Sequence, residues 1–231
     1  MCGIVGYVGT RNAIPVILDG LRRLEYRGYD SAGVALLRDG QIAVVKRAGK
    51  IAGLEAALRT SIPECTVAIG HTRWATHGEP NESNAHPHMD CRNEIAIVHN
   101  GVIENYAALK RKLLDDGHVF RSETDTEVLA HLIEQFYVRD TNLEQAVRRA
   151  LTQIKGTYGL VVVAAREPDK LVVARSGSPL AIGIGDNEHI IASDASAIVE
   201  HTRRVTYLED GEMAVVTCGG FSITTLADVP V

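Results

Sequence analysis

The 231-residue sequence lacks any apolar run long enough, at about 18 residues, to cross a membrane as a helix. Its first ten residues also lack the basic start and apolar stretch of a secretory signal. Basic residues are in the minority, with 24 Lys plus Arg against 29 Asp plus Glu. A dedicated nucleic-acid-binding protein should be basic. We therefore expect a cytoplasmic protein that binds neither nucleic acid nor membrane.

Cysteine is scarce, and its four positions, 2, 65, 91 and 218, show no C-x-x-C spacing. A reduced chain without disulfides is the simplest interpretation. Histidines are more numerous and include His71, His77, His86 and His88. No carboxylate or cysteine stands at a recognised zinc-ligand spacing beside these four. We expect no metal and expect these histidines to hold loops by hydrogen bonds.

The remaining composition, 45% hydrophobic and 23% charged, is typical of a globular domain, and the absence of a linker or repeat favours a single one. Short runs rich in Val and Ile predict strands, and apolar residues at helical spacing predict helices. Two hairpins are expected, with turns near Asp39-Gly40 and Pro168-Asp169. Helices do not alternate strictly with strands, which favours a sheet core with helices outside over a doubly wound fold. The strands are expected at 4–8, 33–37, 42–45, 67–69, 95–98, 160–165, 171–174, 180–184, 190–192 and 213–217, and the helices at 14–24, 105–117, 124–136 (begun by a capping box, Thr124 to Glu127) and 143–154.

Cys2 is the first candidate for chemistry. If Met1 is removed, this residue carries both a thiol, with a pKa of about 8.5, and an α-amine, with a pKa of about 7.7–8.0. A terminal amine can then take the proton of its own nucleophile, directly or through one water. Position alone leaves open that Cys2 is merely an exposed or packed cysteine.

Arg73 and Trp74 belong to the stretch 71–78, which follows an apolar strand and is expected to form a loop at its end. The planar guanidinium of Arg73 suits a carboxylate. The alternative is that Arg73 makes a surface ion pair and Trp74 fills core.

Two further segments each have a plain and a chemical interpretation. Asn100-Gly101 is a turn signal, but an Asn amide and the next backbone N–H can also stabilise an oxyanion together. Asp125 suits the first turn of a helix, where the dipole favours a carboxylate, or it can accept a substrate ammonium.

The combination of these signals is more specific than any one of them. It resembles the class II glutamine amidotransferases, and within them the glutaminase domains of the members that transfer ammonia to fructose 6-phosphate. The likeness covers nearly the whole chain. The strings that carry it are CGIVG (2–6), YRGYDSAG (26–33), HTRWATHG (71–78), NAHPH (84–88), HNGVIEN (99–105), SETDTE (122–127), ARSGSPL (174–180) and ASD (192–194).

The resemblance implies an N-terminal-nucleophile hydrolase fold of the α+β class: a four-layer α/β/β/α sandwich of two antiparallel sheets. It implies one glutamine amidotransferase type 2 domain over 2–231, without the sugar-isomerase half that completes the full-length enzyme. The full-length enzymes are homodimers, held together chiefly through that half. We expect this chain to hydrolyse glutamine but not to form the amino sugar.

The resemblance also implies roles for individual residues. Cys2 attacks the side-chain amide of L-glutamine, and L-glutamate and ammonia are released through a thioester. Asn100 and the N–H of Gly101 form the oxyanion hole, and no metal or organic cofactor is required. The substrate-binding residues are Arg73 for the α-carboxylate, Asp125 for the α-ammonium, Thr76 and His77 in a closing loop, Trp74 at the ammonia passage, and Arg27 and Gly28 around the nucleophile.

Three other functions remain as alternatives. The chain could belong to an amidotransferase with a different acceptor, or it could bind or sense glutamine without turnover. It could also be an N-terminal-nucleophile peptidase or amidase for other amides. An intact set of Cys2, Asn100 and Asp125 disfavours the sensing module.

Overall fold

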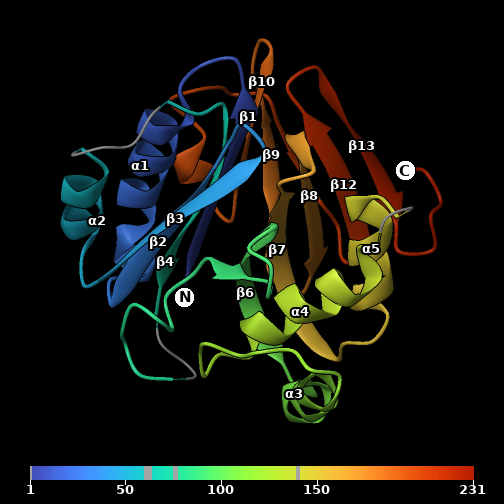
Figure 1. Ribbon diagram of the computed structural model, residues 1–231. Coiled ribbons are helices and arrows are strands. Elements are labelled where there is room, and N and C mark those ends of the chain that lie inside the picture. Colours follow the sequence, from blue (N-terminus) through green and yellow to red (C-terminus); the bar gives the residue numbers. More distant parts are fainter. Residues whose placement is uncertain (1, 60–63, 75–77, 139–140) are drawn as a thin grey trace.

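The computed structural model describes residues 2–59, 64–74, 78–138 and 141–231. Two antiparallel sheets form its centre (Figure 1). The seven-stranded sheet has the order β11-β9-β10-β1-β4-β2-β3 and consists of β1 (Gly3–Gly9), β2 (Ser31–Arg38), β3 (Gln41–Ala48), β4 (Val67–Arg73), β9 (Ala181–Ile184), β10 (Glu188–Ala192) and β11 (Val205–Tyr207). The six-stranded sheet has the order β13-β12-β8-β7-β6-β5 and consists of β5 (His88–Met89), β6 (Ile95–Ile103), β7 (Gly156–Ala164), β8 (Glu167–Ser176), β12 (Glu212–Thr217) and β13 (Gly220–Thr225).

Helices cover the outer face of each sheet. Figure 1 shows α1 (Ala13–Leu24) and α2 (Ile51–Leu58) outside the seven-stranded sheet, and α4 (Thr126–Phe136) and α5 (Leu143–Leu151) outside the six-stranded one. Helix α3 (Tyr106–Asp115) packs against α4. The expected four-layer sandwich of the α+β class is confirmed. Among the described residues, no helix is long and apolar enough to cross a membrane.

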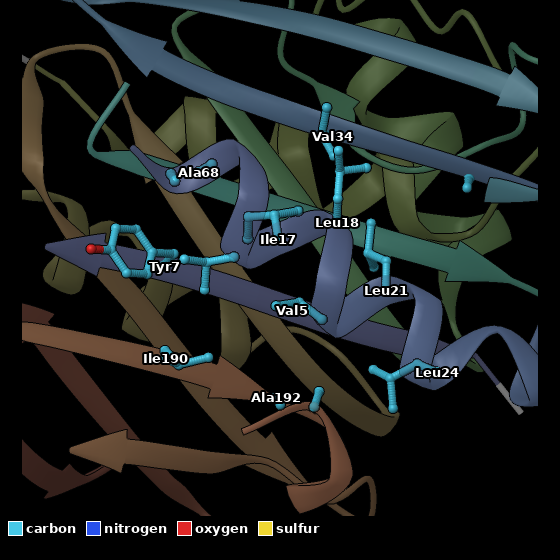
Figure 2. Packing of buried hydrophobic residues seen from close by; sticks show 14 of the residues in the cluster. Val5, Tyr7, Ile17, Leu18, Leu21, Leu24, Val34, Ala68, Ile190 and Ala192 are labelled. Carbon is cyan, nitrogen blue, oxygen red and sulfur yellow. The ribbon is translucent and has the colours of Figure 1, made fainter. Parts of the chain in front are cut away.

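Three apolar clusters lie between the four layers of helices and sheets. Strand β1 contributes residues to two of these clusters. Ile4 packs between the sheets, whereas its neighbour Val5 faces α1. This alternation is the two-residue period of a strand whose faces are both buried. Figure 2 shows Val5 and Tyr7 of β1 beneath Ile17 and Leu21 of α1. The third cluster lies between α4, α5 and the six-stranded sheet.

One of the two expected turns is correct and the other is wrong. Asp39 and Gly40 join β2 to β3 with positive φ angles of 51° and 69°, as favoured hairpin turns require. The turn near Pro168-Asp169 is wrong, because β8 already begins at Glu167. Glu167 pairs with Ala164 beside a register irregularity, where a strand tolerates a proline nearby. No pattern in the sequence predicted α2, β5, β11 or β13.

Candidate active site

The two sheets meet at a cavity of about 250 Å³ beside the start of β1 and the end of β4. Most of the candidate residues reach it from elements far apart in the sequence. The lining consists of Cys2, Arg27, Arg73, Trp74, His86, His99, Asn100, Gly101, Val102, Thr124, Asp125, Thr126, Ser178, Pro179 and Ser193.

Cys2 immediately precedes β1, the middle strand of its sheet, which is bonded to β4 on one side and β10 on the other. Its Sγ accepts a hydrogen bond from the backbone N–H of Trp74 at 3.3 Å and lies 3.6 Å from the carbonyl oxygen of Trp74. Burial raises the pKa of the Cys2 thiol, and the Trp74 N–H opposes this shift only in part. The thiol therefore needs a base to become a nucleophile at neutral pH.

Asn100 reaches the same point from the other sheet. Its Nδ2 donates to the carbonyl oxygen of Cys2 at 3.2 Å, and its Oδ1 lies 3.0 Å from Nε2 of His71. The side-chain amide has two N–H groups. One is engaged by Cys2, so the other can serve a ligand in the cavity.

Asn100-Gly101 is not a turn, so that interpretation was wrong. Strand β6 continues through both residues to Ile103, and Gly101 lies opposite Tyr158 of β7. Gly101 has a φ of +133°, and a Cβ there would lie 2.1 Å from the carbonyl oxygen of Thr157. Only glycine fits this backbone conformation.

Asp125 lies at the start of α4, but the expected capping box is absent. Its Oδ2 accepts the backbone N–H of Ile103 at 2.7 Å, and its side chain makes no bond to its own helix. Glu127 instead accepts backbone N–H groups of Arg121 and Ser122, both at 2.7 Å. The carboxylate of Asp125 is thus held at the end of β6 and faces the cavity.

Arg73 is the last residue of β4, so His71, Thr72 and Arg73 belong to a strand rather than to the expected loop. The Arg73 residue is only 4% exposed, which rules out a surface ion pair. Its guanidinium donates to the carbonyl oxygens of Gly78 at 3.2 Å and Glu79 at 3.3 Å.

Gly28 and Arg27 occupy different places around Arg73 and Cys2. A Cβ at Gly28 would lie 2.8 Å from the backbone carbonyl carbon of Arg73, so the glycine allows a close approach to the end of β4. Arg27 lines the cavity and pairs with Asp194 at 3.0 Å.

Trp74 is 47% exposed at the cavity wall, so the alternative that it fills core is wrong. The ring of Tyr29 lies edge-on to it, with ring centroids 5.4 Å apart. Thr76 and His77, the candidates for a closing loop, lie outside the described residues.

Three buried histidines stack beside the cavity. The sequence did not predict this stack. His71 and His86 stack with centroids 4.1 Å apart, and His86 meets His88 edge-on at 4.7 Å. Burial lowers the pKa of His71 to about 3 and the pKa of His86 and His88 well below the ordinary value. His99 Nδ1 lies 2.9 Å from Thr126 Oγ1. As expected, these rings make hydrogen bonds: His88 bonds Thr124 in the loop before α4, whereas His71 and His86 bond residues of β6.

The cavity therefore brings together a thiol, an amide donor and side chains of both charges. Of the candidates in the described residues, all but Gly28 line it, and Gly28 stands directly behind Arg73. No role in the site was predicted for His99, Ser178 or Thr124, although all three stand within the motif strings.

Comparisons with known proteins agree with this arrangement. Residues 71–200 match the family described as "Glutamine amidotransferase domain". The chain is 56% identical to the glutamine–fructose-6-phosphate aminotransferase (isomerizing) of Chlorobaculum tepidum, covering 99% of this chain and 38% of the relative. It is 53% identical to the enzyme of the same name from Symbiobacterium thermophilum, covering 100% of this chain and 38% of the relative. The chain thus spans well under half the length of these relatives.

A solved structure shows the same fold. It is the glutamine phosphoribosylpyrophosphate amidotransferase from B. subtilis, complexed with ADP and GMP. The TM-score is 0.81 at 30% identity, and the match covers 97% of this chain and 49% of that one.

Proposed function

Because the chain belongs to the glutamine amidotransferase domain family, we propose that residues 2–231 form a glutaminase unit with the Cys2 thiol as its nucleophile. The reaction is hydrolysis of the side-chain amide of L-glutamine to L-glutamate and ammonia. The observation that carries this proposal is the convergence of the Cys2 thiol, the Asn100 amide and two opposite charges on one cavity.

The charges fit the backbone end of an amino acid. Arg73 supplies a planar cation for the α-carboxylate, and Asp125 supplies an anion for the α-ammonium. Both side chains are buried and lie on rigid elements, β4 and the start of α4. Such a pair would orient glutamine with its side-chain amide free to approach Cys2.

The proposed reaction begins when Cys2 Sγ attacks the amide carbon and its proton passes to the Cys2 α-amine, which removal of Met1 sets free. The second N–H of Asn100 and the N–H of Gly101 would stabilise the resulting oxyanion. The α-amine then protonates the departing nitrogen, so that ammonia leaves and a γ-glutamyl thioester remains. Water, activated by the same amine, releases glutamate and restores the thiol.

The other candidate residues complete the site. Arg27 lines the cavity and Gly28 stands behind Arg73, and we assign Trp74, at the cavity wall, to the passage through which ammonia would leave. The proposal that Thr76 and His77 close over glutamine rests on their sequence motif alone.

We further propose that the ammonia serves fructose 6-phosphate in a longer, homodimeric protein with a sugar-isomerase half. What supports this is the high identity, over nearly the whole chain, to relatives named for that acceptor. A free, nucleophilic thiol at Cys2 also suits the reducing cytoplasm, where we place the protein.

The test of the glutaminase proposal pairs intact mass with glutamate release from glutamine. Wild type, Cys2→Ala and Cys218→Ala are compared, because Cys218 is an exposed cysteine outside the cavity. We expect loss of Met1, glutamate from wild type and Cys218→Ala, and none from Cys2→Ala. A processed wild type that binds glutamine without releasing glutamate would support the sensing alternative instead.

The acceptor is tested separately. This chain is fused to the remaining part of the Chlorobaculum tepidum relative, and amino-sugar phosphate formation from fructose 6-phosphate is measured. A fusion that hydrolyses glutamine and forms no amino sugar would favour a different acceptor.

A further inference from the structure

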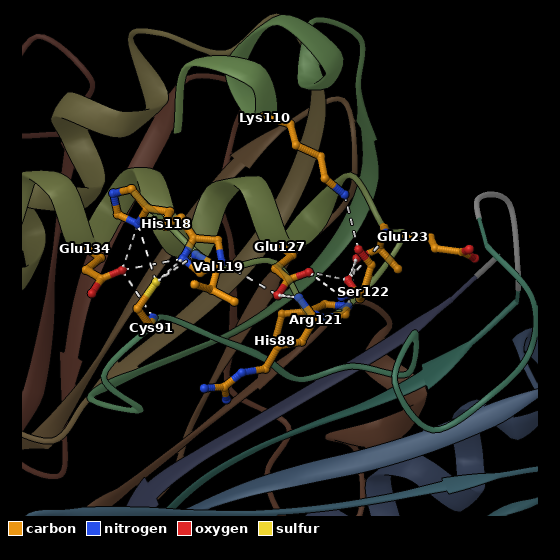
Figure 3. A network of polar contacts seen from close by, with 12 residues as sticks. His88, Cys91, Lys110, His118, Val119, Arg121, Ser122, Glu123, Glu127 and Glu134 are labelled. Atoms are coloured by element: carbon orange, nitrogen blue, oxygen red, sulfur yellow. Dashed lines mark hydrogen bonds and ion pairs between the residues drawn. The ribbon is translucent and has the colours of Figure 1, made fainter. Parts of the chain in front are cut away.

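Four potential metal ligands meet at a second place in the molecule. Cys91 follows β5, His118 follows α3, and His131 and Glu134 lie on α4. We call these residues the Cys-His-His-Glu cluster. Figure 3 shows Cys91, His118 and Glu134 directed toward one another. The ligand atoms of the four residues all lie within 4.8 Å of one another.

Four of the six separations between these ligand atoms match a tetrahedral zinc site, and the other two are within 4.8 Å. Ligand bonds of about 2.3 Å to sulfur and about 2.0–2.1 Å to nitrogen and oxygen imply S···N separations of roughly 3.6 Å and N···O separations of roughly 3.3 Å. Cys91 Sγ lies 3.7 Å from His118 Nδ1 and 3.5 Å from His131 Nδ1. Glu134 Oε2 lies 3.1 Å and 3.4 Å from the same two nitrogens.

We propose that the Cys-His-His-Glu cluster binds one Zn²⁺ through Cys91 Sγ, the two Nδ1 atoms and Glu134 Oε2. A thiolate, two imidazoles and a carboxylate form a donor set that suits zinc and supplies all four positions. His131 is 1% exposed, and the side chains of His118 and Glu134 are 13% and 12% exposed. Such a closed, largely buried site is of the structural kind.

The groups behind the ligands fit this assignment. His131 Nε2 is buried without a hydrogen-bond partner and lies 3.6 Å from Glu127 Oε1, and a carboxylate on that side of the ring favours the tautomer that leaves Nδ1 free for the metal. The backbone N–H of Val119 donates to Cys91 Sγ at 3.4 Å, as it would to a thiolate. Arg92 lies 3.7 Å from Glu134 Oε1, whereas Oε2 accepts the backbone N–H of Cys91 at 3.2 Å and has a second lone pair for the metal.

Without a metal, hydrogen bonds account for the cluster only if the His131 ring is protonated and donates from both nitrogens. A neutral imidazole carries one proton, yet His131 faces carboxylates on both sides, Glu127 at Nε2 and Glu134 at Nδ1. One ring nitrogen would then direct a lone pair at a carboxylate in the interior. Zinc at Nδ1 removes that conflict and also satisfies the sulfur of Cys91.

The site would tie three separate segments together, one of which is α4, the helix that Asp125 precedes. Cys91 fixes the turn after β5, His118 fixes the connection from α3 to α4, and α4 carries the other two ligands. This proposal departs from the sequence expectation of no metal. The histidines weighed there and placed by the structure, His71, His86 and His88, belong to the stack at the cavity.

The experiment uses an untagged Cys2→Ala chain, because an N-terminal cysteine can itself chelate metal. Zinc is measured by elemental analysis, and the apo chain is titrated with Co²⁺ and followed by absorption. We expect about one zinc per chain, and a tetrahedral cobalt spectrum with a thiolate charge-transfer band. Cys91→Ser should abolish that band, and His118→Asn should weaken binding at least about 100-fold, beyond the cost of losing an outer-shell contact.

Cys218→Ser in the same background is the matched control and should bind as the parent does, since Cys218 is exposed and outside the cluster. Zinc should raise the melting temperature of the parent but not of His118→Asn. Failure of the parent to bind zinc, or full binding by both ligand variants, would overturn the proposal. If Cys91→Ser does not fold, the parent's cobalt spectrum and His118→Asn decide. None of these measurements requires glutamine turnover.

Discussion

His71 and Asn100 are joined across the two sheets, with His71 Nε2 3.0 Å from Asn100 Oδ1. Burial lowers the pKa of His71 to about 3, so its ring is neutral at physiological pH. Because Asn100 Nδ2 already donates to Cys2, Oδ1 is the acceptor and His71 must donate from Nε2. A buried neutral histidine thus fixes the direction of the amide in the proposed oxyanion hole.

This relationship predicts non-additive kinetics. Asn100→Ala should lower kcat for glutamine hydrolysis about 10²- to 10³-fold, as loss of one oxyanion donor typically does. His71→Leu, which cannot orient the amide, should lower kcat about tenfold with little change in KM. In the double variant the His71 change should cost almost nothing more. Steady-state kinetics on folded variants would contradict the relationship if the two effects simply multiplied.

Asp125→Asn is expected to weaken substrate binding more than chemistry. The Asn oxygen can still accept the N–H of Ile103, but the negative charge for the α-ammonium is gone. A hydrogen bond to a charged group contributes about 1.5–3 kcal/mol, so KM should rise roughly 10- to 100-fold. Initial rates over a range of glutamine concentrations measure this. Asp115→Asn, at the exposed end of α3, should leave KM unchanged.

Gly101→Ala should destabilise the fold as well as impair the site. The new Cβ would meet the Thr157 carbonyl oxygen at 2.1 Å, at a φ of +133°. Strain and overpacking together should lower the free energy of unfolding by on the order of 3 kcal/mol. Gly219→Ala is the matched control, because nothing lies within 4 Å of a Cβ there. Urea unfolding of both variants, with equal losses, would argue against this account of β6.

The histidine stack predicts how stability depends on pH. The folded pKa of His71 is about 3, and burial also lowers the pKa of His86 and His88, whereas the unfolded value is about 6.5. Below about pH 6.5 the unfolded chain therefore binds protons that the folded chain does not. Above that pH the contribution of these histidines to the free energy of unfolding is complete. Below it, the free energy of unfolding should fall by about 1.4 kcal/mol per pH unit for each histidine.

Urea unfolding at several pH values between about 7.5 and 5 measures this slope. Carboxylates whose pKa is lowered on folding, such as Glu127, lose their contribution to stability only below about pH 4.5, which is outside this range. His88→Asn should reduce the slope by about one histidine's share. An unchanged slope in that variant would exclude His88 as a source.

The sequence predicted the layers, and most of its candidate residues line one cavity, but it did not predict the paths of the strands that carry them. Alternating apolar residues in β1 and helical spacing in α1 are local signals and were sufficient. Gly101 resembled a turn residue because its positive φ is shared by turns and by irregular strands. Asp125 resembled a helix cap because its actual partner, Ile103, is 22 positions away. Long-range contacts of this kind leave no mark on local spacing.

The Cys-His-His-Glu cluster was missed for a related reason. Only His131 and Glu134 stand close in the sequence, three positions apart on one face of α4. Cys91 and His118 reach them through the packing of α3 and β5 against that helix.

The central position of β1 bears on how activity would be lost. Cys2 adjoins a strand that is hydrogen-bonded on both sides and packed on both faces. Backbone amides of such strands exchange with solvent only when the whole domain opens. We therefore expect the chain next to Cys2 not to unfold locally, as chain ends commonly do. Heating should abolish glutamine turnover only when the whole domain melts.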